Sequence, residues 1–207
     1  MDIGYVILAG GQSKRLGRDK IKEVIGDKTL LARVISVLAA FKGEMTIVLA
    51  ENSPEPDISA FPQVKMVRDL YPGKGMIGGI VTGLSLSRHD YNLVVAGDMP
   101  FLNPGLLKYF IDVADGNDLA AYRNQSNFEP LHAVYSRNCL PVLSEIMQKN
   151  LRIIELAQHV KVRYITNEEL TRYDPDNRSF FNINTEADLE IARNISRQIT
   201  RNDLSSG

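Results

Sequence analysis

The stretch VILAGGQSKRLGRDK, Val6–Lys20, joins an apolar segment to a glycine pair and a basic loop. Residues 3–9 are apolar and β-prone without polar alternation, which predicts a strand covered on both faces. Gly10 and Gly11 then remove the side chains where the chain leaves this strand, so a ligand can approach the backbone closely. Bare N–H groups beside several cations suit a polyphosphate. We therefore expect an anion at this loop, the alternative being a tight turn with a solvated basic loop.

Neither common phosphate-binding motif accounts for this loop. A P-loop reads G-x-x-x-x-G-K-[ST], but the corresponding positions after Gly11 are Leu16-Gly17-Arg18. A second stretch, GKGMIG at residues 73–78, does match the dinucleotide pattern G-x-G-x-x-G. It is separated from the preceding predicted strand by residues 68–72, which end in a proline, whereas the motif should follow a strand directly. A dehydrogenase is therefore not expected.

Composition limits the class of protein. The chain has 207 residues, 44% hydrophobic and 24% charged, which is typical of a globular domain with a substantial core. A net charge of −1 makes the basic loop a local feature and argues against bulk nucleic-acid binding. There is no long apolar run and no signal-peptide pattern, and Cys139 is the only cysteine. We expect a cytoplasmic protein without a membrane span, a disulfide framework or a cysteine-rich metal site, and we place Cys139 in the core.

Strand and helix patterns alternate through about residue 115. Predicted strands at 3–9, 45–50, 64–67 and 92–96 alternate with predicted helices at 30–38, 75–86 and from 104 onward, after an Asn103 cap. This order predicts an α/β fold in three α/β/α layers, with a Rossmann-like, mostly parallel sheet. A ligand then binds at the carboxyl ends of the strands, where the loops carry Gly10, Asn52, Asp69 and Asp98.

The second half is less regular. Strands are predicted at 131–135 and 160–165, helices at 140–147 and 151–159, and a capping box at Thr185 opens a last helix through Ile195. No linker divides the chain, so we expect one domain over residues 1–198, with a nucleotide-binding half (1–115), an acceptor-binding half (116–198) and a frayed tail (199–207).

Asp98 is the clearest candidate for a metal ligand. It lies at a strand end after Gly97, and Mg²⁺ favours one or two carboxylates together with phosphate oxygens. Capping of its own turn is the alternative role. Together with the basic loop it indicates phosphoryl or nucleotidyl transfer, which depends on positioning and charge neutralisation. A phosphate nucleophile needs no catalytic base, so His132 is expected to be a hydrogen-bonded structural histidine.

Five motifs in order resemble nucleotidyltransferases of the molybdenum cofactor guanylyltransferase (MobA) type. They are the signature loop LAGGQSKRLGRDK, GMIGGI at 75–80, VAGDMP at 95–100, EPL at 129–131, and FNINT at 181–185 followed by Asp188-Leu189. They spread over residues 5–195. The resemblance implies a fold like that of nucleotide-diphospho-sugar transferases. It also implies transfer of GMP from GTP to molybdopterin, with release of pyrophosphate and with Mg²⁺ as cofactor.

The resemblance also assigns roles to individual residues. It makes Arg15, Lys20 and Asp98 the catalytic residues, with Asp98 as the metal ligand and Lys22 as a spare candidate for the role of Lys20. The GTP-binding residues would be Leu8, Ala9, Gly10, Gly11, Lys20, Asn52, Asp69 and Asp98. The acceptor-binding residues would be Gly78, Gly79, Pro130, Asn182 and Asn184. For Asp69, closing the turn before Pro72 is the alternative role. Other molybdenum-cofactor biosynthesis proteins are expected partners.

This chain departs from the family pattern at Met76, Gly78 and Glu129, which stand where relatives carry Pro, Ala and His or Gln. The alternatives are a related nucleotidyltransferase that uses CTP or another phosphorylated acceptor, such as cobinamide phosphate or a sugar phosphate, and a non-catalytic GTP-binding regulator. Ala9-Gly10-Gly11 favours GTP, because cytidylyltransferase relatives carry Ala-Ala-Gly at this point.

Overall fold

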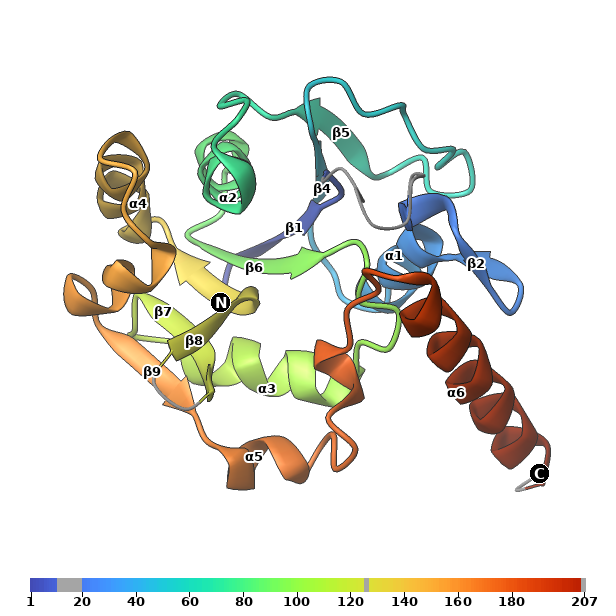
Figure 1. Ribbon diagram of the computed structural model, residues 1–207. Helices are drawn as coiled ribbons and strands as arrows, with labels where there is room; N and C mark the ends of the chain where they lie inside the picture. The colour runs from blue at the N-terminus through green and yellow to red at the C-terminus, as the bar shows by residue number, and fades with distance from the viewer. Residues whose placement is uncertain (11–19, 125–126, 206–207) are drawn as a thin grey trace.

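A seven-stranded sheet forms the centre of the molecule. The computed structural model describes residues 1–10, 20–124 and 127–205 (Figure 1). The strand order is β5-β4-β1-β6-β8-β7-β9, and only β8 is paired antiparallel to both of its neighbours. The mostly parallel α/β sheet expected from the sequence is therefore confirmed. The strands are β1 (Ile3–Leu8), β4 (Met45–Leu49), β5 (Lys65–Arg68), β6 (Tyr91–Ala96), β7 (Leu119–Asn124), β8 (Asn127–Ser136) and β9 (Val162–Ile165).

Helices cover both faces of this sheet. One core cluster packs α1 (Leu30–Leu38) and α3 (Pro104–Ala114) against one face, and a second packs α2 (Gly75–Leu86) and α4 (Cys139–Gln148) against the other (Figure 1). Cys139 is fully buried in the second cluster, as expected. The two faces have separate cores because strand side chains alternate: Ile7 belongs to the first cluster and Val6 to the second. These layers confirm the predicted α/β/α architecture.

A third, smaller cluster attaches the end of the chain. The last helix, α6 (Glu186–Ser205), packs through Leu189 and Ala192 against the hairpin of β2 (Val24–Ile25) and β3 (Lys28–Thr29) and against Leu30. Its outer half extends away from the sheet (Figure 1). The helix continues to Ser205, so the prediction of a frayed tail from residue 199 was wrong in its secondary structure. Ile199, four residues after Ile195, continues the amphipathic spacing beyond the expected end.

The other differences are short elements, most of them in the second half. The sequence did not predict β7, the hairpin, or the short helix α5 (Asn167–Thr171) with its Thr166 capping box. The predicted helix at 151–159 is a 3₁₀ helix, η2 (Ile153–Gln158), and two further 3₁₀ turns are η1 (Lys20–Lys22) and η3 (Arg178–Phe180). Among the described residues, no helix is both long and apolar enough to cross a bilayer.

Candidate active site

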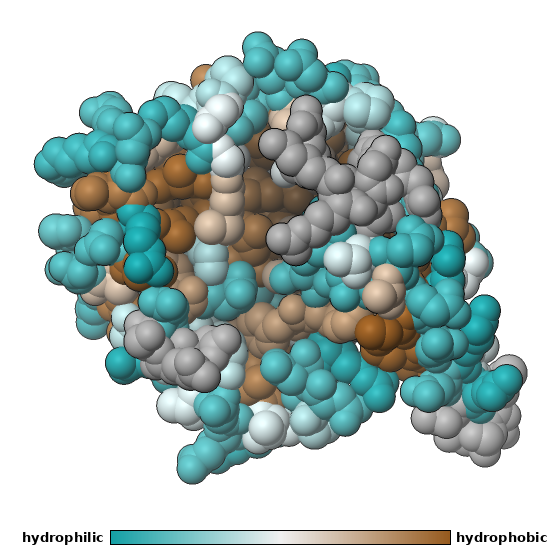
Figure 2. All heavy atoms as spheres, in the orientation of Figure 1, coloured by the Kyte–Doolittle hydropathy of each residue, from teal (hydrophilic) through white to brown (hydrophobic). Residues whose placement is uncertain are grey.

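The parallel strands β1, β4, β5 and β6 end side by side, and backbone hydrogen bonds continue past their ends. Ala9 N donates to Val48 O at 2.9 Å, Gly97 N to Leu8 O at 2.9 Å, and Asp69 N to Leu49 O at 2.8 Å. The four loops with predicted site residues therefore leave the sheet at one edge, as the topology requires. Figure 2 shows a hollow near the centre of the face drawn, with apolar atoms at its bottom and hydrophilic atoms around it.

The start of the signature loop is fixed by packing. Leu8 is half-buried, Ala9 is buried, and Gly10 is exposed. A Cβ at Gly10 would overlap the backbone nitrogen of Ala50, just beyond β4. The glycine is therefore required by the neighbouring strand, whereas the sequence suggested only access for a ligand. Gly11 and Arg15 lie outside the described residues, and their roles stay predictions.

Asp98 lies at the end of β6 and is 8% exposed. Its carboxylate forms an ion pair with the Lys20 ammonium, which also donates a hydrogen bond to Asn184 Oδ1 at 3.1 Å. Three segments that are remote in sequence thus bring one carboxylate, one ammonium and one amide together. The carboxylate and the amide carbonyl are oxygen donors of the kind that Mg²⁺ prefers. In the described part of the chain, no three His, Cys, Asp or Glu side chains form a metal-binding group, so a cation at Asp98 would need phosphate oxygens as further ligands.

The segment before α6 holds Asn184 in place. Asp188 Oδ2 accepts hydrogen bonds from Asn184 N at 3.0 Å and Thr185 N at 2.8 Å, and Thr185 Oγ1 accepts one from Asp188 N at 3.2 Å. The predicted capping box is therefore present, with Asp in the place of Glu. The hydrogen bond from Asn184 N has the largest effect on the pKa of the Asp188 carboxyl and, together with Thr185, lowers it below its usual value against the opposing effect of burial. Ile183 N also donates to Asp98 O at 3.3 Å, which joins this segment to the β6 loop.

The structure separates Lys20 from Lys22. Lys20 is half-buried at Asp98, whereas Lys22 is exposed on the other side of η1. Lys22 lines a separate cavity of about 340 Å³ with Glu55 and Asp57. Lys20 is therefore the lysine that lies at the candidate active site.

Asp69 closes the turn after β5. Its Oδ1 accepts hydrogen bonds from Tyr71 N at 3.0 Å and from the Thr82 hydroxyl at 2.8 Å, and Thr82 Oγ1 accepts one from Leu70 N at 3.0 Å. The turn-closing role, weighed as the alternative from the sequence, is present in the structure. Asn52 lies in the turn after β4, which Ser53 N closes by donating to Ala50 O at 3.0 Å, and its side chain is exposed. Contact of either residue with a nucleoside stays a prediction.

The glycines of α2 permit close packing. A Cβ at Gly78 would lie 2.8 Å from Tyr71 O and 3.2 Å from Asp69 Oδ2, and one at Gly79 would lie 3.2 Å from the Leu8 side chain. Both glycines are buried, and a side chain added at either position would point into the protein. Any contact with an acceptor would have to use their backbone atoms. Gly73 and Gly75, part of the dinucleotide-like pattern, have φ values of 82° and 59° and form the turn into α2.

Glu129 is a site residue whose position the sequence did not reveal. Burial raises the pKa of its carboxyl, the negative charge of Asp98 raises it further, and a hydrogen bond from Leu131 N at 3.0 Å opposes both. Asp98 thus acts electrostatically on Glu129, which in the sequence is distinguished only by its departure from the family motif. The antiparallel strand β8 brings it there, because Val95 of β6 is paired with His132. Pro130 O accepts a hydrogen bond from the Tyr135 hydroxyl at 2.8 Å, and Asn182 is half-buried beyond η3.

His132 differs from expectation. It is fully buried between the rings of Phe110 and Phe180, with centroid distances of 4.9 and 4.7 Å, and neither ring nitrogen has a partner at hydrogen-bonding geometry among the described residues. Burial lowers its pKa to about 4. His132 is structural, as predicted. The prediction that it is hydrogen-bonded was wrong for the described part of the chain, and the charge of Asp174 and the Ser179 backbone only partly offset the effect of burial on its pKa.

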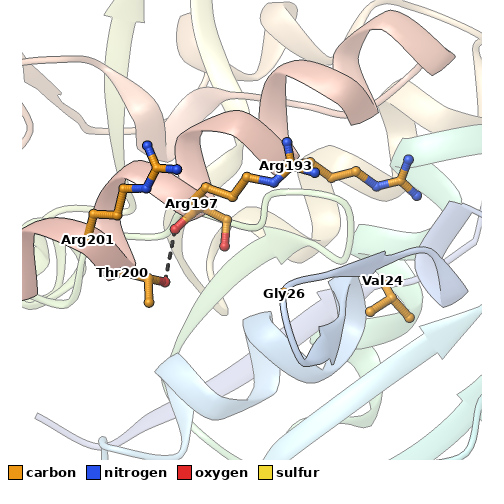
Figure 3. A pocket seen from close by; sticks show the side chains of 7 residues that line it. Val24, Gly26, Arg193, Arg197, Thr200 and Arg201 are labelled. Atoms are coloured by element: carbon orange, nitrogen blue, oxygen red, sulfur yellow. Dashed lines mark hydrogen bonds between the residues drawn. The ribbon is translucent and has the colours of Figure 1, made fainter. Parts of the chain in front are cut away.

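A cavity of about 510 Å³ lies away from Asp98, between α6 and the β2–β3 hairpin (Figure 3). None of the predicted site residues that the structure describes lines it.

Comparison with known proteins places these features in a family. Residues 5–162 match the MobA-like NTP transferase domain family. A probable molybdenum cofactor guanylyltransferase of Natranaerobius thermophilus is 35% identical, over 93% of this chain and 95% of its own length. Another, of Pelotomaculum thermopropionicum, is 33% identical, over 91% and 90% of the two chains. The crystal structure of molybdopterin-guanine dinucleotide biosynthesis protein A from Archaeoglobus fulgidus has a TM-score of 0.80 at 27% identity, covering 94% of this chain and 99% of that one.

Proposed function

Because this chain belongs to the MobA-like NTP transferase family, we propose that it transfers GMP from GTP to molybdopterin. A phosphate oxygen of molybdopterin attacks the α-phosphorus of GTP, the bond from that phosphorus to the bridging oxygen breaks, and pyrophosphate leaves with the bonding electrons. The observation that supports the proposal is that Lys20 contacts both Asp98 and Asn184 at the carboxyl edge of the sheet, by an ion pair and a hydrogen bond. The attacking phosphate is already an anion, so the reaction needs no general base, in keeping with the burial of His132 away from solvent.

The nucleotide occupies the end of β1 in this proposal. The backbone of Leu8, Ala9 and Gly10 faces the guanosine, and the Gly11–Arg15 loop surrounds the triphosphate. Asn52 and Asp69, at the ends of β4 and β5, lie on the same edge and contact the nucleoside; Asp69 keeps Oδ2 for this contact, because its turn hydrogen bonds use Oδ1. Residues 1–115 thus bind the nucleotide.

Asp98 holds the divalent cation, for which we propose Mg²⁺. The cation neutralises phosphate charge and stabilises the leaving group when it is bound. In the nucleotide-free protein the Lys20 ammonium takes the position of a counter-ion to Asp98. We propose that the incoming phosphates attract Lys20, which releases the carboxylate. Lys20 then stabilises the charge that develops on the pyrophosphate.

The acceptor occupies the part of the edge formed by residues 116–198 together with the first turns of α2. Gly78 and Gly79 of α2 offer backbone groups, and Pro130 and Asn182 flank the site. The Asn184 side chain can donate to a phosphate oxygen through Nδ2, because Lys20 uses only Oδ1. Glu129 lies where the negative acceptor would enter. Its raised pKa makes its carboxyl easier to protonate than an ordinary one, which lessens repulsion of a phosphate. Other molybdenum-cofactor biosynthesis proteins are proposed to deliver or receive the pterin.

The proposal is tested by measuring pyrophosphate release with molybdopterin and each of GTP, CTP, ATP and UTP. We expect release with GTP, and a loss of about 100-fold or more in the Asp98→Asn variant, the scale typical of removing one electrostatic stabiliser. Unchanged thermal unfolding of the variant serves as the control for folding. Preference for CTP, or release only with cobinamide phosphate or a sugar phosphate, would redirect the assignment to a related transferase. GTP binding without release under any condition would indicate a regulator.

A further inference from the structure

The cavity beside α6 has a cationic wall. It is lined by Arg193, Arg197 and Arg201 with Ser196 and Thr200 on α6, and by Val24 and Gly26 on the hairpin. Figure 3 shows the arginines following one another along the helix, with Val24 and Gly26 across from them. The spacing of four residues places the three guanidinium groups on one side of α6. The result is a groove of about 510 Å³, within the size range of pockets that bind small molecules.

The positive charge of this groove is incompletely balanced. Among the described residues that line it there is no carboxylate, although Asp27, next to Gly26 in the hairpin turn, acts electrostatically on Arg33. The acidic neighbours of Arg193 are distant, with Glu23 at 3.8 Å and Glu190 at 4.0 Å, near the limit of an ion pair. In the described part of the chain, Arg197 donates to the neutral Asn194 Oδ1 at 3.1 Å, and neither Arg197 nor the exposed Arg201 has a carboxylate within ion-pair distance. Like charges four residues apart repel each other on a helix. Since the whole chain has a net charge of −1, a generally basic composition does not explain this cluster.

A fourth arginine reinforces the floor of the groove. Arg33 on α1 donates to Ser196 Oγ at 2.9 Å and to Ile25 O at 2.9 Å, and thereby joins α6 to the hairpin. Gly26, at a φ of 67°, makes the tight turn between β2 and β3, and a side chain there would come within 3.1 Å of Arg33 Nη2. The groove therefore has a fixed back wall made of backbone and buried polar groups, and a front of arginine side chains that can adjust to a ligand.

We propose that this groove binds a small polyanion of the phosphate class, with two or three linked phosphates. Guanidinium groups present forked donors that match phosphate oxygens in pairs. Three of them in sequence match the charge of a diphosphate or triphosphate, and the Thr200 hydroxyl lies among them. Such a ligand can be inorganic pyrophosphate or a nucleoside triphosphate. The site is distinct from Asp98, because none of the residues of that site lines the groove.

The test uses amide NMR signals of the groove itself, so that binding at Asp98 does not interfere. Pyrophosphate, tripolyphosphate and GTP are titrated separately into the full chain, and the signals of Gly26 and Thr200 are followed. We expect saturable shifts with pyrophosphate and tripolyphosphate. A GTP affinity at least tenfold above that of tripolyphosphate would identify a nucleoside triphosphate as the ligand, and equal affinities would identify the linked phosphates alone.

Two variants and a control complete the design. Arg197→Ala/Arg201→Ala should weaken binding at the groove at least tenfold, and Arg197→Lys/Arg201→Lys should weaken it less, because charge is kept and the forked donors are lost. Arg152→Ala, which changes an exposed arginine elsewhere, should leave the titration unchanged. The proposal is overturned if Gly26 and Thr200 do not shift with millimolar pyrophosphate, or shift equally in the alanine variant. It is also overturned if only a glutamate-rich peptide shifts them, which would mark the groove as a docking surface for an acidic protein.

Discussion

At the scale of single residues, the position of Lys20 defines the state of the candidate active site. An ammonium group paired with Asp98 competes with any cation for the same carboxylate. The Lys20 ammonium also donates a hydrogen bond to the amide oxygen of Asn184 at 3.1 Å. The free protein should consequently bind a divalent cation weakly, and the nucleotide should increase that affinity by attracting Lys20 to its phosphates.

Substitution of Lys20 tests this competition. We expect Lys20→Met to raise the Mn²⁺ affinity of the nucleotide-free protein by about tenfold, equivalent to removing about 1.4 kcal/mol of competing interaction, and to lower the rate of pyrophosphate release. Mn²⁺ binding is measured by electron paramagnetic resonance. Lys22→Met is the matched control and should leave the affinity unchanged, since Lys22 is exposed away from Asp98. A lower Mn²⁺ affinity in Lys20→Met would contradict the competition.

His132 gives the molecule a pH-dependent stability. Its pKa is about 4 in the folded protein, against an ordinary value of 6.5, because burial disfavours the charged imidazolium; the negative charge of Asp174 opposes this in part. The unfolded chain therefore binds the proton first as pH falls. The stabilisation is fully present above pH 6.5 and is lost progressively between pH 6.5 and pH 4.

Between pH 7 and pH 5, the lowered pKa of His132 should reduce the free energy of unfolding by about 2 kcal/mol, from the linkage between proton binding and stability. Urea unfolding at the two pH values measures it. His132→Phe keeps an aromatic ring between Phe110 and Phe180 and cannot titrate, so its free energy of unfolding should change less over this interval. Equal pH dependence in the two proteins would show that other groups are responsible.

At the scale of elements, local pattern predicted the first half closely. The spans predicted for α1 and α2 agree with the observed Leu30–Leu38 and Gly75–Leu86, and the Asn103 cap is present, with Asn103 Oδ1 accepting from Leu106 N at 3.0 Å. These elements have strong periodicity and clear end signals. The second half was predicted less well. β7 is as long as β1, but it is stabilised by pairing with β8 and β9, and such pairing depends on partners that its own sequence does not reveal.

The contact between α2 and β1 depends on a glycine. A Cβ at Gly83 would overlap Val6 Cγ1, and Val6 is stiff because it is β-branched. Gly83→Ala should lower the free energy of unfolding by about 1–3 kcal/mol, since overpacking outweighs the helix propensity gained from alanine. Chemical denaturation measures this effect. In a Val6→Ala background, Gly83→Ala should lower the free energy of unfolding by less than it does in the unaltered protein. Strictly additive effects of the two substitutions would contradict the steric explanation.

At the scale of the whole molecule, the C-terminal helix α6 packs against residues from the first part of the chain. Its first turns pack on the hairpin and on Leu30, in a cluster separate from the two faces of the sheet. This cluster holds Asn184 near Lys20, which otherwise belongs to the opposite end of the sequence. The integrity of the candidate active site therefore depends on a small peripheral core.

Leu189→Ala tests this dependence. Leu189 is fully buried in the peripheral cluster, and its truncation should cost about 2–5 kcal/mol locally. Hydrogen exchange should show lost protection in α6 and at residues 181–185, with little change in β1 and β6. A uniform loss of protection across the sheet would indicate that α6 unfolds together with the rest of the protein.

The sequence alone determined the layers of the fold and the edge at which Asp98 lies. Periodicity and strand-end signals are local, and parallel topology then places the ends of β1, β4, β5 and β6 together. Only the tertiary structure decided that Lys20 rather than Lys22 pairs with Asp98, that the charge of Asp98 acts on Glu129, and that three arginines face the hairpin. It also decided that His132 lies between two phenylalanine rings. Each of these depends on which remote segments pack together, and the hydrophobic pattern of one segment does not specify its partners.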